Sequence, residues 1–141
     1  MAPLFAQVDP TMKAGRLLRQ IVRARIMAQV PALAGKVFDR ATEGLAYPYA
    51  TLGPSYWSDT SVQCIEAREI TLQIDIWHSQ SNKGVLEDLT DDVAAALSGW
   101  ADEAALTMHP LSVTMVRVMD DPDGKSLHGV VQVEAMVEDD G

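Results

Sequence analysis

The sequence predicts an α+β fold, an antiparallel or mixed β-sheet with two α-helices packed on one face. Two stretches repeat apolar residues at helical spacing, and several shorter stretches have the composition or the alternation of β-strands. These elements do not follow the regular strand–helix–strand order that would indicate a parallel sheet. We expect all 141 residues to form a single domain, because a chain of this length can bury one core.

The first helix is expected over residues 10–29. Asp9 and Pro10 are residue types favoured at the N-cap and at the first helical position, and Pro31 ends the helix. The apolar stripe consists of Ala14, Leu17, Leu18, Ile21, Val22 and Ala28, and the basic face of Lys13, Arg16, Arg19 and Arg23. Arg25 falls within the apolar stripe, so we expect its guanidinium to reach solvent or to meet a carboxylate.

Two short strands are expected after this helix, at residues 37–38 and 49–52. Pro48 and Pro54 flank the second strand and restrict it to a short or edge position. The segment that follows, GPSYWSD at residues 53–59, is rich in turn-forming residues. We therefore expect it to be an extended loop.

The clearest strand is expected over residues 69–79, where apolar and other residues alternate strictly. One face carries Ile70, Leu72, Ile74 and Ile76, and the other carries Thr71, Gln73, Asp75 and Trp77. A second helix follows over residues 83–99, with an apolar stripe of Leu86, Leu89, Val93, Ala96, Leu97 and Trp100. Gly99 is suited to the position after the helix end, although the helix can also extend toward Ala105.

A β-hairpin is expected over residues 112–137, and its turn, DDPDGKS, has the residue types of a calcium loop. Placing Gly124 at the sixth position of an EF-hand loop puts Asp123 and Asp121 at the fifth and third positions. The first position would then be Met119 and the twelfth Val130, neither of which can bind Ca²⁺ through its side chain. The pattern therefore predicts a turn rather than a metal site.

No catalytic, metal-binding or cofactor-binding residues are predicted. His78, His109 and His128 are isolated from one another, and the sequence contains no zinc, nucleophile or phosphate-binding motif. The single cysteine, Cys64, cannot form an internal disulfide. An enzyme with scattered residues around His128 or His78 stays an alternative, and the interpretation of His128 that we prefer is a hydrogen-bonded structural residue.

Charge is divided unevenly along the chain. Residues 1–84 have a net charge of +2 and residues 85–141 a net charge of −11, which together give −9. This balance argues against nucleic acid as the main ligand, and no apolar run approaches the roughly 20 residues of a membrane span. A basic face such as that at Arg16, Arg19 and Arg23 is most commonly a solvated surface. The functional interpretation is a contact with an acidic protein neighbour, and a small nucleic-acid- or membrane-binding module is the alternative.

A group of aromatic residues lies outside the regular elements. It consists of Tyr47, Tyr49, Tyr56 and Trp57. Core packing is the ordinary role of such residues, but tyrosine and tryptophan in irregular segments are also typical of protein interfaces. We include them among the candidate interface residues.

Three blocks of the chain resemble the tail-completion proteins of long-tailed phages. The blocks are VFDRATEGLAYPYATLG (37–53), ITLQIDIWHSQSNKGVLEDLTDDVAAAL (70–97) and MDDPDGKSLHGVVQVEAMVE (119–138), in the same order and spacing. This is the tail-terminator or tail-to-head-joining group, which also occurs in gene transfer agents. The sequence departs from the pattern at Trp77-His78-Ser79, where Trp followed directly by Ser is expected, and in the acidic segment 100–106.

The resemblance implies a structural virion protein, assembled in the bacterial cytoplasm, without enzymatic activity or cofactor. It implies a hexameric ring that caps the tail tube, ends tail growth and joins the tail to the head-side connector or stopper protein. Duplex DNA would pass through the lumen without sequence-specific contact, and we expect part of the C-terminal acidic excess to line that lumen. The turn residues Asp121, Asp123 and Lys125 are expected to contact the next protein along the tail.

Overall fold

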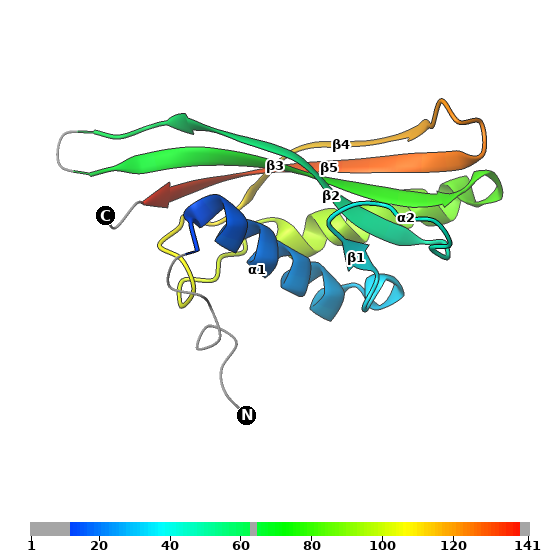
Figure 1. The fold of residues 1–141 in the computed structure, drawn as a ribbon, viewed down its shortest axis with the longest axis horizontal. Coiled ribbons are helices and arrows are strands. Elements are labelled where there is room, and N and C mark those ends of the chain that lie inside the picture. The colour runs from blue at the N-terminus through cyan, green and yellow to red at the C-terminus, as the bar shows by residue number, and fades with distance from the viewer. Residues whose placement is uncertain (1–11, 63–64, 139–141) are drawn as a thin grey trace.

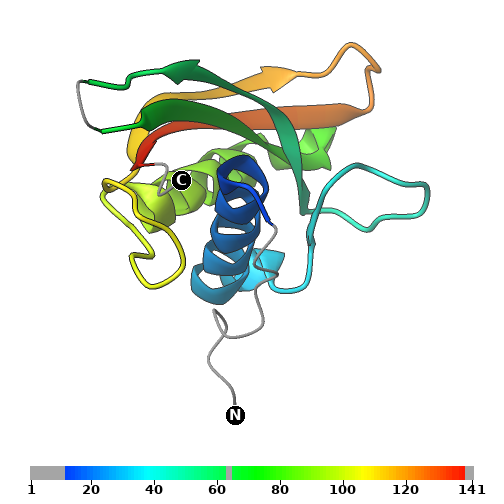
Figure 2. The same ribbon diagram turned by 60° about the vertical axis from the view of Figure 1, so that its left-hand side comes forward.

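A computed structural model describes residues 12–62 and 65–138. The elements in chain order are α1 (Ala14–Gln29), β1 (Val37–Phe38), β2 (Tyr49–Asp59), β3 (Ala67–Ser79), α2 (Lys83–Leu97), β4 (Ser112–Asp120) and β5 (Ser126–Glu138). The five strands form one sheet in the order β1-β2-β3-β5-β4. Only β1 and β2 pair in parallel, so the sheet is mixed. Both helices cover the same face, and the α+β prediction is confirmed (Figures 1 and 2).

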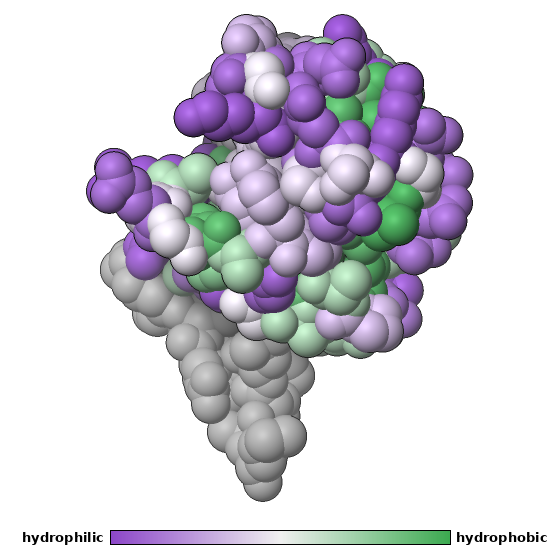
Figure 3. Space-filling model, turned by 90° about the vertical axis from the view of Figure 1, so that its right-hand side faces the viewer, coloured by the Kyte–Doolittle hydropathy of each residue, from purple (hydrophilic) through white to green (hydrophobic). Residues whose placement is uncertain are grey.

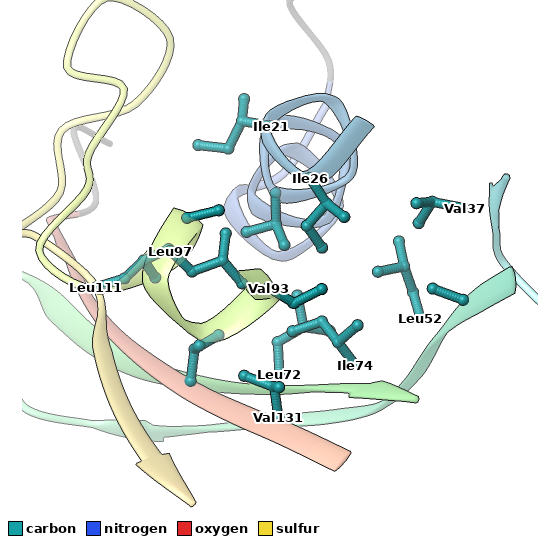
Figure 4. Packing of buried hydrophobic residues seen from close by; sticks show 14 of the residues in the cluster. Ile21, Ile26, Val37, Leu52, Leu72, Ile74, Val93, Leu97, Leu111 and Val131 are labelled. Atoms are coloured by element: carbon teal, nitrogen blue, oxygen red, sulfur yellow. The ribbon is translucent and has the colours of Figure 1, made fainter. Parts of the chain in front are cut away.

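The core lies between the helices and one face of the sheet. The alternation predicted for β3 is present, and Ile74 pairs across the ladder with Val131 of β5 while both side chains are fully buried. Ile26 of α1 and Val93 of α2 pack against this face (Figure 4). Burying an aliphatic side chain of this size contributes about 1.5–3 kcal/mol, so this layer holds the helices on the sheet.

The helix α1 begins later than predicted. Met12 and Lys13 are not helical, and Lys13 has extended backbone at the N-cap position. Asp9 and Pro10, on which the predicted start depended, lie outside the described residues. The helix ends at Gln29 as expected, because Pro31 begins a short 3₁₀ turn that points the chain toward β1.

Arg25 is half-buried, and its guanidinium meets a main-chain carbonyl and an aromatic ring rather than the carboxylate that we considered. Its Nε donates a hydrogen bond to the main-chain oxygen of Ala96 at 2.9 Å, and its guanidinium lies 5.3 Å from the ring centroid of Trp100. The last carbonyl groups of a helix have no partner within the helix, so the C-terminal end of α2 offers an acceptor. Arg25 therefore ties α1 to the end of α2 within the core-facing stripe.

The expected loop at residues 53–59 is instead the second half of β2. Tyr56 pairs with Thr71 and Asp59 with Arg68, and a register shift lies between Leu52 and Ser55. Pro54 falls within this shift, where its missing N–H does not break a regular ladder. We call this segment, together with the facing end of β3, the arm; it extends past both helices (Figure 1), and β5 pairs with the other edge of β3 as far as Ala67. Because Pro54–Asp59 are exposed on both faces of the strand, this half of β2 lacks the alternation that identifies a half-buried strand.

The helix α2 ends at Leu97, and Gly99 lies just after the helix end, as predicted. Gly99 has a φ of +73°, and its N–H donates to the carbonyl of Leu111 at 2.8 Å. The carboxylates of Glu87, Asp88, Asp91 and Asp92 are exposed on the outer face of α2. Within residues 12–62 and 65–138, no helix is long and apolar enough to span a bilayer.

Candidate partner interfaces

The predicted interface residues lie in three separate places rather than in one site. The first place is α1, which carries Arg16, Arg19 and Arg23. The second is the end of the sheet where β2 begins, with Tyr47 and Tyr49, and where the β4–β5 turn lies, with Asp121, Asp123 and Lys125. The third is the arm, which carries Tyr56 and Trp57. The first two places face different directions, and the arm projects from the opposite end of the sheet (Figure 1). Each place is therefore described separately.

A groove of about 1110 Å³ runs beside α1. Its lining includes Arg16, Arg19, Arg23, Met27, Phe38 and Asp102. Two of the arginines hold neighbouring chain segments: Arg23 Nε donates to the carbonyl of Val37 at 2.7 Å, and Arg19 lies 3.6 Å from Asp39. Arg16 is exposed. The lining of the groove thus mixes apolar side chains with three arginines and two carboxylates, and two of the arginines are held by β1 and the residue after it.

At the other end of the molecule, three rings form a stack. Tyr47 lies 5.7 Å from Tyr49 and 6.1 Å from His78, in both cases nearly parallel. Burial raises the pKa of Tyr49, and Tyr47 and the nearby carboxylates of Asp123 and Asp121 raise it further. Tyr49 therefore stays uncharged and lies within electrostatic reach of the β4–β5 turn.

His78 is neutral in this stack. Its Nδ1 accepts a hydrogen bond from the N–H of Ser79 at 2.8 Å. Burial lowers the pKa of His78, and the positive charge of Lys36 lowers it further. Seen from this end, the surface is mainly hydrophilic, with small hydrophobic patches between the polar groups (Figure 3). An interface here would consequently be polar with a few aromatic contacts.

The β4–β5 turn is held by its own aspartates. Asp123 accepts hydrogen bonds from the N–H groups of Lys125 and Ser126 and from the Ser126 hydroxyl, at 2.8–3.0 Å. Asp121 accepts one from the N–H of Asp123, and Gly124 takes a φ of +70°. These bonds lower the pKa of Asp123. The carboxylates therefore shape the turn, and the described part of the chain contains no cluster of three or more potential metal ligands.

A polar network on the helix-free face of the sheet was not predicted. The Nε2 atom of His128 lies 2.6 Å from Asp75 Oδ1, and its ring stacks on Trp77 at 4.1 Å. Trp77 donates to the Thr51 hydroxyl at 3.1 Å. Gly53 leaves room for the Asp75 carboxylate, since a Cβ atom there would lie 2.4 Å from Oδ2. His128 is thus a hydrogen-bonded structural residue, which is the interpretation that we preferred from the sequence. Its partners Asp75 and Trp77 were predicted to share one face of the strand, and that was the only hint of this network in the sequence.

The arm carries four exposed apolar residues, two of which were not singled out from the sequence, and Tyr56 and Trp57 lie on opposite faces of the strand. Tyr56 and Trp57 are 62% and 57% exposed, and Val62 and Ile65 are 62% and 49% exposed. The Arg68 guanidinium lies over the Trp57 ring, 4.6 Å from its centroid. Val62 and Ile65 pair with each other in an isolated antiparallel bridge. Their sequence context, a single apolar residue among polar ones, gave no signal.

The comparison with known proteins identifies the family. The profile of the phage family described as tail completion protein gp17 matches residues 20–138, from within α1 to the last residue of β5. The chain belongs to this family. No curated protein sequence matches it significantly.

Two solved structures have the same fold as this tail completion protein. One is a chain from the virion of a native gene transfer agent particle, with a TM-score of 0.67 and 17% identity over 83% of this chain and 94% of the other. The second is the gp17 protein of bacteriophage SPP1, with a TM-score of 0.57 and 17% identity over 96% and 99% of the two chains. The predicted resemblance is therefore confirmed.

Family membership also decides the broad class of function. The tail completion family is structural, so the prediction that the protein is not an enzyme is confirmed. The histidines considered for a scattered site have other roles: His128 joins Asp75 and Trp77, and His78 joins the tyrosine stack. The protein is a component of the phage-type tail assembly.

Proposed function

We propose that this protein caps the tail tube as a ring of identical subunits, ends tail growth and joins the tail to the head-side connector or stopper protein. The observation that carries the proposal is the match to the tail completion family across both helices and the whole sheet. The fold shared with a chain of a gene transfer agent virion and with SPP1 gp17 supports a place in such a particle. The ring is expected to be a hexamer.

The distribution of charge supports contacts between unlike surfaces of neighbouring subunits. The groove beside α1 is lined by three arginines and two carboxylates, whereas the outer face of α2 carries four exposed carboxylates with Lys83 as the one cation of the helix and Arg117 of β4 beside it. Contacts between two different surfaces are heterologous, and they close into rings when the rotation between subunits permits. We therefore assign the candidate interface residues on α1 to the contact with a neighbouring subunit.

The acidic excess of the C-terminal part suits a channel for DNA. Residues 85–141 carry a net charge of −11, and an acidic wall repels phosphates, so that a duplex passes without binding. We assign part of this excess to the lumen. The turn residues Asp121, Asp123 and Lys125, together with Tyr47 and Tyr49, are assigned to the contact with the tail tube protein or the head-side protein.

Deleting the gene from its phage or gene transfer agent tests this function. Particles made without the protein are expected to yield tails of uncontrolled length that are not attached to heads, and expression of the protein from a plasmid should restore joined particles. Tails of normal length joined to heads in the deletion strain would contradict the proposal.

The alternative, a nucleic-acid- or membrane-binding module, would use Arg16, Arg19 and Arg23. It predicts salt-sensitive binding to duplex DNA or anionic vesicles that is lost when Arg16 and Arg23 are replaced by Glu. We prefer the protein neighbour because the chain as a whole has a net charge of −9, which repels a polyanion.

A further inference from the structure

We propose that the arm of each subunit inserts Trp57, with the exposed apolar residues Val62 and Ile65 near its tip, into the groove beside α1 of the next copy in the ring; Tyr56 lies on the opposite face of the strand. This inference rests on the proposed ring. It joins two features that the family assignment leaves without a role, the arm formed by the distal halves of β2 and β3 and the arginine-lined groove. The occupant of the groove is thus a second copy of this chain.

The arm has the properties of a segment that is covered by a partner. Its outer strand, the second half of β2, is exposed from Pro54 to Asp59 and extends past the helical layer (Figure 1). Trp57, Tyr56, Val62 and Ile65 are all about half exposed or more. Tryptophan and tyrosine contribute disproportionately to protein interfaces, and clustered exposed apolar residues commonly mark a contact surface.

The groove matches the arm in size and character. Its volume, about 1110 Å³, is large enough for several side chains, and its lining includes the apolar side chains of Met27 and Phe38. An indole ring placed there would also lie near the guanidinium groups of Arg16 and Arg19, with which aromatic faces interact favourably.

The charges of the two surfaces are complementary. The arm carries the carboxylates of Asp59, Glu66 and Glu69, and Arg68 is its single cation among residues 55–62 and 65–72. The groove is lined by three arginines against the two carboxylates of Asp39 and Asp102, and Arg19 already lies beside Asp39. A net negative arm therefore meets a net positive groove.

The arm of one subunit cannot fill the groove of the same subunit. Ser55, at the base of the arm, lines the groove, while the strands pair continuously from Ser55–Leu72 outward to Asp59–Arg68 and lead the tip away from α1 (Figure 1). Folding the tip back would break this ladder. A neighbouring copy is consequently the source of the arm, and a contact between two such different surfaces is compatible with a closed ring.

Photocrosslinking in assembled particles tests the inference. A benzoylphenylalanine at position 57 is expected to crosslink to a peptide that contains residues 16–27 of another copy, identified by mass spectrometry in particles built from a mixture of isotopically light and heavy subunits. A crosslink to the tube protein, to the head-side protein or to α2 instead would overturn it.

A matched pair of variants gives a second measurement. The double variant Trp57→Ala/Val62→Ser is expected to raise the protein concentration needed to cap half of the tail tubes by at least about tenfold. Val85→Ser, which removes an equally exposed apolar group from α2, should leave that concentration unchanged. The melting temperatures of both variants show whether the fold is retained.

The outcomes separate this inference from the proposed function. If the arm variant caps tubes as well as the wild-type protein, the arm inference is wrong and the ring stands. If the wild-type protein forms no ring at tube ends, the proposed function is wrong and the arm inference falls with it.

Discussion

At the scale of single residues, two close approaches set the tightest limits on substitution. Gly53 leaves space for the Asp75 carboxylate beside His128, and Gly129 lets Thr90 of α2 approach β5. The sequence favoured a structural role for His128, but its partners lie 53 residues away in the chain and depend on the register of β3 and β5. A single sequence does not determine that register, so the network could not be predicted.

Gly129→Ala is expected to destabilise the protein. The added Cβ would lie 2.4 Å from the Thr90 hydroxyl, which itself donates to the Leu86 carbonyl inside the core. Overpacking of this kind costs about 1–3 kcal/mol, which should lower the melting temperature by roughly 3–10 °C. Gly84→Ala is the control, because nothing lies within 4 Å of its added Cβ. Equal melting temperatures for the two variants would show that α2 does not approach β5 this closely.

His78 is expected to make stability depend on pH near neutrality. Burial lowers its pKa below 6.5, so the unfolded chain binds a proton more readily than the folded chain. The contribution of neutral His78 to the free energy of unfolding is complete above pH 6.5. It is lost as the pH falls from 6.5 toward the lower pKa that His78 has in the folded protein. Urea unfolding at pH 7.5, 6.5 and 5.5 measures the free energy of unfolding. This free energy should decline less with falling pH in His78→Gln than in His109→Gln. An identical decline in both variants would rule out this role of His78.

At the scale of elements, the sequence was most informative where one face of an element is buried. The strand β3 and both helices have such faces, and their periodic patterns placed them within a few residues. The arm half of β2 is open on both faces, so no alternation distinguished it from a loop. The start of α1 depended on Asp9 and Pro10, which are good capping residues, yet Met12 and Lys13 are not helical. Local propensity alone therefore misplaced this boundary.

The β4–β5 turn gives a prediction for an element. Asp123→Ala removes the acceptor for the N–H groups of Lys125 and Ser126 and for the Ser126 hydroxyl. We expect faster amide hydrogen exchange at residues 121–127 and a lower melting temperature. The control is Asp120→Ala, an exposed carboxylate at the end of β4. If both variants exchange equally fast in this segment, Asp123 does not hold the turn.

At the scale of the whole molecule, the division of charge along the chain is only partly a division between surfaces, because Asp102 lines the arginine groove and Arg117 lies beside Glu87 and Asp91 of α2. Arg16, Arg19 and Arg23 line one groove, whereas the exposed carboxylates of α2 form an acidic face. The resemblance to tail-completion proteins was visible in three ordered blocks, and the family was confirmed. Which surfaces meet in the ring could not be predicted, since the arm that we assign to the groove was not recognised as a strand.

The central claim, a ring at the end of the tail tube, is tested most directly by electron cryo-microscopy of the head–tail junction in purified particles. The account predicts a six-fold ring of this fold between the last ring of tube protein and the head-side protein, with the arm of each subunit on α1 of the next. A junction without this protein, or a single copy bound elsewhere in the particle, would contradict it.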